Sequence, residues 1–495
     1  MKAHLMYRDR DFGPPAEITP TDTALIEDLG LEGIFAAMSG EDPLLHEVAR
    51  QALLGQIEEV REIEYRQGAL RDCLAHPETI RKVHEIAIAA TRRPKQIWGS
   101  LGRSPGLVLS HAVRLLRSLL KDLHALRELA DENSARFESE AFTAFFEMIG
   151  RELDDAYLGE IAEHLRRLEF KSGTLISARL GAGGKGTDYV LRRSTKEPQG
   201  LERLTTLFDR SGYTFHLAPR DETGARALED LRDQGINLVA EAAEQSAEHV
   251  VAFFTALLSE IGFYVGCLNL RDRIGDRDLP ICMPEVGRPG EVELDARGLY
   301  DVGLALRTDD RLVLNDIGAG DRPLVVITGA NQGGKSTFLR SIGLAQLMAQ
   351  AGMFVAAESF RADLRDGLFT HFKREEDAGM RSGKLDEELA RMSEIADALR
   401  PGSMVLFNES FAATDEQEGS EIARQVTAAL LSAGIKVIHV THMYELAHGF
   451  EESESVGVLF LRAERTEDGT RTFRLFEAPP LSTSFGEDVY RRVFA

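Results

Sequence analysis

The chain has 495 residues, with 58 Lys or Arg and 81 Asp or Glu, so its formal net charge at pH 7 is −23 with His neutral. Hydrophobic residues make up 43% and charged residues 28% of the sequence, which excludes a disordered or collagen-like chain and suggests roughly three structural units. The three cysteines are far apart and have no C-x-x-C spacing, so neither a disulfide framework nor a thiolate zinc site is expected.

The N-terminal sequence, MKAHLMYRDRDFGPP, has charges where a signal peptide needs an apolar stretch. No apolar run in the sequence approaches the ~18 residues that a membrane span needs. The sequence therefore predicts a cytoplasmic protein without a membrane partner.

From about residue 22 to residue 90, apolar residues recur at helical spacing, and Asp42 followed by Pro43 is typical of a helix start. After the break WGSLGRSPG, amphipathic patterns continue over about residues 107–170 with few Gly or Pro. These patterns predict packed helices followed by the long helices of a lever.

Residues 173–193 contain two short runs rich in β-forming residues around a Gly-rich turn, which predicts a β-hairpin. Helical patterning returns over about residues 223–274 and ends at a Pro- and Gly-rich stretch, residues 279–290. The sequence therefore predicts a helical part over residues 1–278, with a small β element near 171–220, and a second domain over residues 279–495.

Basic residues gather in two stretches of this acidic chain. Residues 91–128 hold eight basic and two acidic residues, and residues 173–220 hold eight basic and four acidic ones. An acidic protein repels the DNA backbone unless cations are gathered locally, so these stretches are either solvated faces or DNA contacts. The residues predicted to contact DNA are Lys95, Arg103, Lys185, Arg192, Arg193 and Lys196.

Beyond residue 279, strand-like runs (LVVIT, MVLF and KVIHVT) alternate with helical stretches. This alternation predicts a parallel sheet covered by helices. The expected fold class is therefore mixed, with a mostly α-helical N-terminal part and an α/β C-terminal domain.

The strand-like LVVIT is followed by GANQGGKST, which fits the phosphate-binding pattern G-x-x-x-x-G-K-[ST] in the order strand, loop, helix. Glycines let backbone N–H groups surround a phosphate, the lysine adds positive charge and the next hydroxyl binds Mg²⁺. The predicted nucleotide-binding residues are Gly329, Ala330, Asn331, Gln332, Gly333, Gly334, Lys335, Ser336 and Thr337. Lys335 is also predicted to act in catalysis, and Ser336 to bind Mg²⁺.

Two further strand ends carry residues suited to hydrolysis. Glu409 follows MVLFN and is placed to orient or deprotonate the attacking water. His442 follows KVIHVT, from where it can contact a γ-phosphate. A lone His is more often structural, and only the phosphate loop and Glu409 favour a catalytic role for this one.

Four segments in this order, TGANQGGKSTFLRSIG, GMFVAAE, LFNES and VTHMYEL, resemble the ATPase domain of the MutS family, which is itself ABC-like. The resemblance extends to VLNDIG before the loop, TSFGEDVY near the end and IEYRQGALRDCL near the N-terminus. It implies that the nucleotide is ATP, that residues 279–495 form an ABC-type P-loop domain, and that a helical core and lever carry a clamp that touches DNA. By its order along the chain, the predicted hairpin would be the β element of this clamp.

In ABC-like ATPases, two domains enclose two nucleotides, and a signature segment from the other subunit completes each site. The resemblance therefore implies a homodimer. By order, the signature falls within residues 379–392, with Ser382 as the residue that acts on the partner's nucleotide. The family usually has Ser-Thr and an aromatic residue there, whereas Ser382 is followed by Gly383 and Lys384.

The family's acidic pair Asp-Glu is replaced by Asn408 and Glu409. An Asn amide can bond a Mg²⁺-bound water but brings no negative charge, so Asn408 is predicted as a metal-site residue with weaker metal binding or slower turnover.

Full-length MutS proteins begin with a mismatch-reading domain and a connector domain, whereas the core-like sequence starts here within about thirty residues of Met1. We therefore expect a protein without these domains, which recognises DNA by shape and not by kinking a mispair.

The leading hypothesis is an ATP-gated dimeric clamp that acts in DNA repair or recombination with other proteins of those pathways. The alternative is a slow or non-hydrolysing, nucleotide-dependent scaffold that recruits other proteins. A transporter-coupled or SMC-like ATPase is disfavoured, because the sequence has neither a Leu-Ser-Gly-Gly signature nor a long heptad coiled coil.

Overall fold

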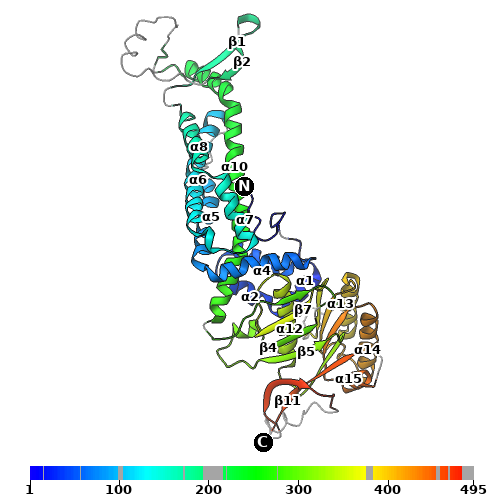
Figure 1. Ribbon diagram of the computed structural model, residues 1–495. Helices are drawn as coiled ribbons and strands as arrows, with labels where there is room; N and C mark the ends of the chain where they lie inside the picture. Colours follow the sequence, from blue (N-terminus) through cyan, green and yellow to red (C-terminus); the bar gives the residue numbers. More distant parts are fainter. Residues whose placement is uncertain are drawn as a thin grey trace. The chain divides into compact units, whose positions relative to one another are not determined.

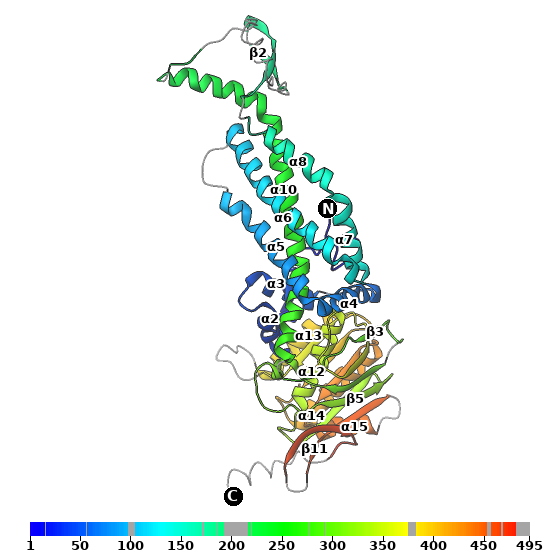
Figure 2. The ribbon, with the colours of Figure 1, turned by 60° about the vertical axis from the view of Figure 1, so that its left-hand side comes forward.

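The computed structural model describes residues 1–14, 16–55, 57–97, 104–170, 173–184, 186–192, 216–218, 220–275, 277–291, 293–374, 383–452, 457–466 and 469–481. The chain divides into two compact units (Figures 1 and 2). Unit 1 comprises residues 1–3, 82–136 and 145–258, and unit 2 comprises residues 4–81, 137–144 and 259–495.

Unit 1 is built mainly from long helices. They are α6 (Pro105–Asn133), α8 (Asp155–Arg167) and the parts that lie in this unit of α5 (Pro77–Ile97), α7 (Glu140–Glu152) and α10 (Glu222–Gly275), with the short η1 (Ser134–Arg136) after α6. In both views α5, α6, α8 and α10 run side by side (Figures 1 and 2). The helices predicted over residues 107–170 and 223–274 are confirmed, and one face of α6 buries Leu109, Leu119 and Leu126.

The predicted β-hairpin is also present in unit 1. Its strands β1 (Ile176–Leu180) and β2 (Gly186–Leu191) are antiparallel, with Ile176 opposite Leu191. The turn between them contains η2 (Ala182–Gly184), in which Gly183 has φ 71°, a left-handed conformation that suits glycine. The clamp function of this hairpin stays a prediction.

Unit 2 begins with four helices, α1 (Pro20–Leu29), α2 (Leu31–Ser39), α3 (Pro43–Leu54) and α4 (Val60–Ala75). The predicted helix start at Asp42 is confirmed. The Asp42 carboxylate accepts a hydrogen bond from the Leu44 N–H (2.8 Å), and Pro43 occupies the first helical position, where its missing N–H costs nothing.

The compact units divide the chain differently from the predicted division at residue 278, because residues 4–81 belong with residues 259–495. Arg66 of α4 is 1% exposed and donates hydrogen bonds to the carbonyls of Met6 (3.1 Å) and Ala351 (3.3 Å). The neighbouring Gln67 donates to the carbonyl of Pro284 (2.9 Å). The bonds to Ala351 and Pro284 reach 285 and 217 positions along the chain, so no local pattern reveals them.

The larger sheet of unit 2 has six strands in the order β12-β11-β6-β10-β9-β8. The strands are β6 (Leu324–Gly329), β8 (Leu368–Phe372), β9 (Met404–Asn408), β10 (Lys436–Val440), β11 (Val458–Arg465) and β12 (Arg471–Glu477). All neighbouring pairs are parallel except β11 and β12. The predicted parallel sheet is therefore present, with one antiparallel edge strand.

Four helices connect or follow the strands of this sheet: α12 (Lys335–Gln350), α13 (Lys384–Ala398), α14 (Glu416–Ser432) and α15 (Tyr444–Glu451). Strands β6, β9 and β10 are buried along almost their whole length, as parallel strands covered by helices must be.

A second sheet of unit 2 was not predicted. It has the order β3-β7-β4-β5, from β3 (Glu285–Gly287), β4 (Leu294–Leu299), β5 (Asn315–Gly320) and β7 (Ser359–Asp363), and the one-turn α11 (Val302–Ala305) follows β4.

Helix α10 corrects one expectation from the sequence. It contains an 18-residue window with a mean hydropathy of 1.8, so it is long and apolar enough to cross a membrane, whereas no such run was expected. It is the one helix of this kind among the residues that the structure describes. Because 67% of the window is buried within the structure, as in the core helix of a packed protein, these properties are weak evidence for a membrane span.

Replacing the buried Arg66 by Ala is expected to lower the free energy of unfolding by about 3 kcal/mol, because it leaves two carbonyls without their donor and opens a cavity. Urea denaturation of the full chain, followed by circular dichroism, measures this change. The control Arg71→Ala alters an exposed residue of the same helix and should change the free energy by less than about 0.5 kcal/mol. Equal effects of the two substitutions would contradict the assignment of Arg66 to the core.

Candidate nucleotide-binding site

The loop between β6 and α12 turns sharply through three left-handed residues. Gly329 has φ 112°, Gln332 has φ 61° and Gly334 has φ 88°. Gly334 is the N-cap of α12 and provides no side-chain hydrogen bond to the helix. A helix start without a side-chain cap leaves its first N–H groups for an anion, and the helix dipole adds positive potential there.

Glycine is required in this loop by close contacts with β11. A Cβ atom on Gly333 would lie 2.8 Å from the Ala330 carbonyl oxygen and 2.8 Å from the Ala463 Cβ. A Cβ atom on Gly329 would lie 2.9 Å from the Ala463 nitrogen. Because β11 pairs with β6 with Ala463 opposite Gly329, only a backbone without side chains fits.

Lys335 lies at the floor of the loop and is 4% exposed. Its Nζ donates hydrogen bonds to the carbonyls of Gly329 (2.9 Å) and Ala330 (3.1 Å). Burial lowers the pKa of Lys335, and the charge of Glu409 partly opposes this shift. The lysine is thus held under the loop, where its charge can meet a phosphate.

Ser336 and Asn408, the two predicted Mg²⁺-binding residues, are in contact. The Ser336 hydroxyl, in the first turn of α12, donates to the Asn408 Oδ1 at the end of β9 over 2.8 Å. Mg²⁺ is usually held by one or two protein oxygens together with phosphates and water, and this pair supplies such oxygens. The described residues contain no cluster of three or more His, Cys, Asp or Glu side chains suited to a metal.

Glu409 and His442 lie at the same edge of the sheet. The His442 Nδ1 is 3.9 Å from the Glu409 Oε2, and the two side chains are 38% exposed for His442 and 31% for Glu409. Glu409 has a left-handed backbone (φ 54°), and its N–H donates to the carbonyl of Val440 (2.9 Å). His442 also lines a cavity of about 160 Å³ that reaches Gly329 and Thr441. The structure therefore brings the predicted carboxylate and imidazole together beside the loop.

Two residues of β12 that no sequence pattern indicated lie next to this loop. Arg471 donates from Nε to the carbonyl of Asn331 (3.3 Å). Phe473 is 49% exposed, and its Cβ and Cδ1 are 3.6 Å from the position of a Cβ on Gly334. An exposed aromatic ring beside a phosphate-binding loop offers a flat surface to a nucleotide base.

Phe473 is held in an unusual conformation by Asn315 of β5. Its φ is 60°, which is rare for an aromatic residue. The Asn315 side chain donates to the Phe473 carbonyl (3.0 Å) and accepts from the Leu475 N–H (2.8 Å). Asn315 belongs to the VLNDIG segment, which resembles the family but did not by itself indicate Phe473.

The remaining predicted residues are Ser382 and the six proposed to contact DNA. Ser382 lies outside the described residues, as do Arg103, Lys185, Arg193 and Lys196. Lys95 of α5 and Arg192, which follows β2, are described and exposed, both in unit 1. Not every cation of the first basic stretch faces solvent freely, because Arg93 is paired with Asp122 (3.0 Å).

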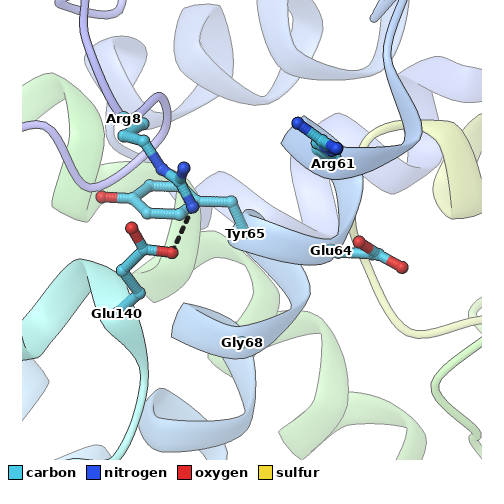
Figure 3. A pocket seen from close by; sticks show the side chains of 6 residues that line it. All are labelled: Arg8, Arg61, Glu64, Tyr65, Gly68 and Glu140. Carbon is cyan, nitrogen blue, oxygen red and sulfur yellow. Dashed lines mark hydrogen bonds and ion pairs between the residues drawn. The ribbon is translucent and has the colours of Figure 1, made fainter.

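Another cavity, of about 370 Å³, lies elsewhere in unit 2 (Figure 3). Its wall is formed by Arg8, Arg61, Glu64, Tyr65, Gly68 and Glu140. Figure 3 shows Arg8 and Glu140 paired beside the Tyr65 ring, with Arg61 and Glu64 pointing away from that pair. The wall contains charges of both signs and no residue of the loop, so it does not indicate a phosphate site.

Comparison with known proteins assigns both parts of the chain. Residues 58–277 match the family model described as "MutS2 N-terminal domain", and residues 325–494 match the model described as "MutS domain V". The chain belongs to the MutS family. The domain V match contains Lys335, Ser336, Asn408, Glu409 and His442, and the MutS2 N-terminal match contains Lys95 and Arg192.

Curated relatives of this MutS-family chain are similar over part of their length. It is 36% identical over 149 residues to "Endonuclease MutS2" of Ligilactobacillus salivarius, which covers 30% of this chain and 19% of the relative. It is 31% identical over 310 residues to "DNA mismatch repair protein MutS 2" of Halobacterium salinarum (59% and 34%). It is 26% identical over 340 residues to "DNA mismatch repair protein MutS" of Leptospira interrogans (62% and 40%). The matched segments therefore span at most 40% of the length of these relatives.

Replacing Asn408 by Asp is expected to lower the Mg²⁺ concentration needed for half-maximal ATP hydrolysis by roughly tenfold, because a carboxylate adds negative charge where Ser336 and Asn408 are predicted to bind Mg²⁺. A Mg²⁺ titration at fixed ATP measures this midpoint. The control Gln234→Glu adds the same charge at an exposed position of α10 and should leave the midpoint unchanged. Activity of Asn408→Asp no higher than wild type at limiting Mg²⁺ would contradict the assignment.

Proposed function

We propose that this MutS-family chain is an ATPase whose nucleotide state opens and closes a homodimeric clamp on DNA, acting in repair or recombination. The observation that carries the ATPase assignment is the contact between Ser336 and Asn408, which joins the phosphate-binding loop to the strand end that bears Glu409. Its cellular location would be the cytoplasm, at the nucleoid in a bacterium.

In the proposed reaction, the N–H groups at the start of α12 and the Lys335 ammonium hold the phosphates of ATP. Glu409 orients the attacking water and accepts its proton, and His442 contacts the γ-phosphate from the neighbouring strand end. Ser336 and Asn408 are the residues that would hold Mg²⁺, which when bound neutralises charge on the β- and γ-phosphates. The partial exposure of Glu409 and His442 leaves them accessible to substrate.

We assign the base of ATP to the exposed face of Phe473. Its ring lies beside Gly334, and Asn315 fixes the backbone on both sides of it. Stacking on an aromatic face is tolerant of base identity, so this contact would contribute affinity more than selectivity.

The proposed dimer follows from the way ABC-like sites are completed. The segment of residues 379–392, with Ser382, would contact the nucleotide of the partner subunit. The exposed edge formed by Glu409 and His442 supports this arrangement, because a second subunit can cover it and exclude water.

DNA is the proposed partner because the similar proteins are named as mismatch repair proteins and an endonuclease. With a net charge of −23, only local groups of cations can hold a phosphate backbone. We assign this contact to the stretches that contain Lys95 and Arg192, and propose that the clamp recognises the shape of branched or duplex DNA and not a mispair.

A second candidate function is a nucleotide-dependent scaffold that recruits other proteins. The amide of Asn408, where the family has a carboxylate, is the observation that favours it, since weak metal binding would slow turnover. The scaffold would need ATP binding but not hydrolysis.

Replacing Glu409 by Gln is expected to lower steady-state ATP hydrolysis by roughly 100-fold or more and to leave ATP binding nearly unchanged, because the amide cannot take the proton of the water. The control is Glu416→Gln, which alters a carboxylate on the wall of the 160 Å³ cavity that His442 also lines. It should hydrolyse ATP at close to the wild-type rate. If Glu409→Gln supports full function in cells, the scaffold is correct and the ATP-driven clamp is wrong.

Replacing Lys95 and Arg192 together by Gln is expected to weaken DNA binding and to reduce the slope of log K against log salt concentration by about 0.9 for each phosphate that is no longer neutralised. Fluorescence anisotropy with duplex and four-way-junction DNA, between about 50 and 200 mM salt, would measure the slope. Arg71→Gln, an exposed charge change in unit 2, serves as the control. A slope equal to that of wild type would remove these residues from the DNA contact.

A further inference from the structure

His371 of β8 is a buried histidine that the proposed reaction does not use. It is 0% exposed, and its ring nitrogens contact two different elements of unit 2. Nδ1 is 2.8 Å from the Ser410 hydroxyl, and Nε2 is 2.9 Å from the backbone carbonyl of Glu388 in α13. A carbonyl only accepts hydrogen bonds, so Nε2 carries the ring proton and Nδ1 is left as an acceptor for the Ser410 hydroxyl.

The protonation of His371 is consistent with this arrangement. Burial lowers the pKa of His371 to about 4, so the ring is neutral at physiological pH. The Ser410 oxygen also lies 2.5 Å from the backbone carbonyl of His371. The single hydroxyl proton is therefore within reach of two acceptors, both belonging to His371.

Ser410 is the middle residue of an unusual turn that begins with Glu409. Glu409 has φ 54° and Phe411 has φ 60°, so both neighbours of Ser410 are in a left-handed conformation that non-glycine residues rarely adopt. Such a conformation persists only where the surroundings hold it. His371 bonds the middle residue, and its ring stacks on that of Phe411 with centroids 5.2 Å apart and an interplanar angle of 17°.

The same histidine links this turn to α13. Besides the bond from His371 to the Glu388 carbonyl, Arg391 of α13 donates to the carbonyl of Phe372 (2.8 Å), which ends the strand that carries His371. Glu388 and Arg391 lie within the predicted signature, residues 379–392. His371 is therefore placed between the turn of Glu409 and the helix that follows Ser382.

We propose that His371 is a positioning residue for ATP hydrolysis: through Ser410 it holds Glu409 in its left-handed conformation, and through Glu388 it fixes that turn to α13. This inference rests on the proposed function, since it assigns His371 to holding the turn that bears the catalytic Glu409. His371 does not touch the substrate, so its replacement should alter the rate of the chemical step and not the binding of ATP.

The chain offers a matched control in His439 of β10. It is 1% exposed, burial lowers its pKa to about 4, and its ring stacks on Phe407 with centroids 5.0 Å apart. Among the described residues, no hydrogen bond of its side chain to the turn of residues 409–411 is found. A substitution there disturbs the same sheet without releasing Glu409.

The test compares His371→Phe, His371→Asn, Ser410→Ala, His439→Phe and Glu409→Gln with wild type, as full chains. We measure kcat and KM for ATP, the equilibrium affinity for a fluorescent ATP analogue, and the melting temperature. His371→Phe keeps an aromatic ring beside Phe411 but removes both hydrogen bonds. It should lower kcat by roughly 10- to 100-fold, since small displacements of a reacting group have effects of this order, and change KM and the affinity by less than about threefold.

Two other variants test the hydrogen bond between His371 and Ser410 from each side. Ser410→Ala should also lower kcat. His371→Asn should recover part of the rate lost in His371→Phe, because its amide oxygen can again accept a hydrogen bond from the Ser410 hydroxyl. His439→Phe should keep kcat within about threefold of wild type.

A kcat of His371→Phe equal to that of His439→Phe, while Glu409→Gln is inactive, overturns this inference and leaves the proposed function intact. Full activity of Glu409→Gln, or no hydrolysis by wild type, overturns the proposed function and this inference with it. If His371→Phe does not fold, Ser410→Ala decides, and an unchanged kcat of that variant overturns the inference.

Discussion

The parallel pairing of β6, β10 and β9 is the constraint on which the candidate site depends. Val326 of β6 lies opposite His439 of β10, and His439 lies opposite Phe407 of β9. Because the strands are parallel and in register, their carboxyl ends meet at one edge of the sheet. Residues that are 72 positions apart, Ser336 and Asn408, thereby come within hydrogen-bonding distance, and Glu409 and His442 follow at the same edge.

Helix α12 extends this edge into the core of unit 2. A buried cation makes hydrogen bonds at each end of this helix. At the start, Lys335 donates to carbonyls of the loop, and at the end Arg66 of α4 donates to the Ala351 carbonyl. A buried cation is costly unless oxygens surround it, so both contacts restrict how α12 can move relative to its neighbours. Helix α12 therefore joins the loop to α4 of the same unit through these two contacts.

The parts of the site that were predictable are those formed by short continuous sequence motifs. The loop, Glu409 and His442 each follow a buried strand, and a strand-loop-helix pattern is readable from spacing alone. Phe473 and Arg471 were missed because β12 reaches the loop only through the pairing of β11 with β6. His371 was missed because its role comes from Ser410 and Glu388, which a sequence pattern does not connect to it. The second sheet escaped prediction since β3 has only three residues and the register of β4 with β5 shifts twice, which breaks the alternation that marks a strand.

The central claim is that the loop around Lys335 binds ATP, and equilibrium binding of ATP to the full chain with Mg²⁺ tests it most directly. The comparison is between wild type, Lys335→Met and Lys436→Met. Lys436 is also buried, but it lies at the start of β10 and is bonded to the carbonyl of Arg322, not to the loop. We predict that wild type and Lys436→Met bind ATP with similar affinity and that Lys335→Met binds at least roughly tenfold more weakly, as expected when a charge-assisted hydrogen bond to phosphate is removed. Equal affinity of all three proteins, or no binding by wild type, would contradict the account.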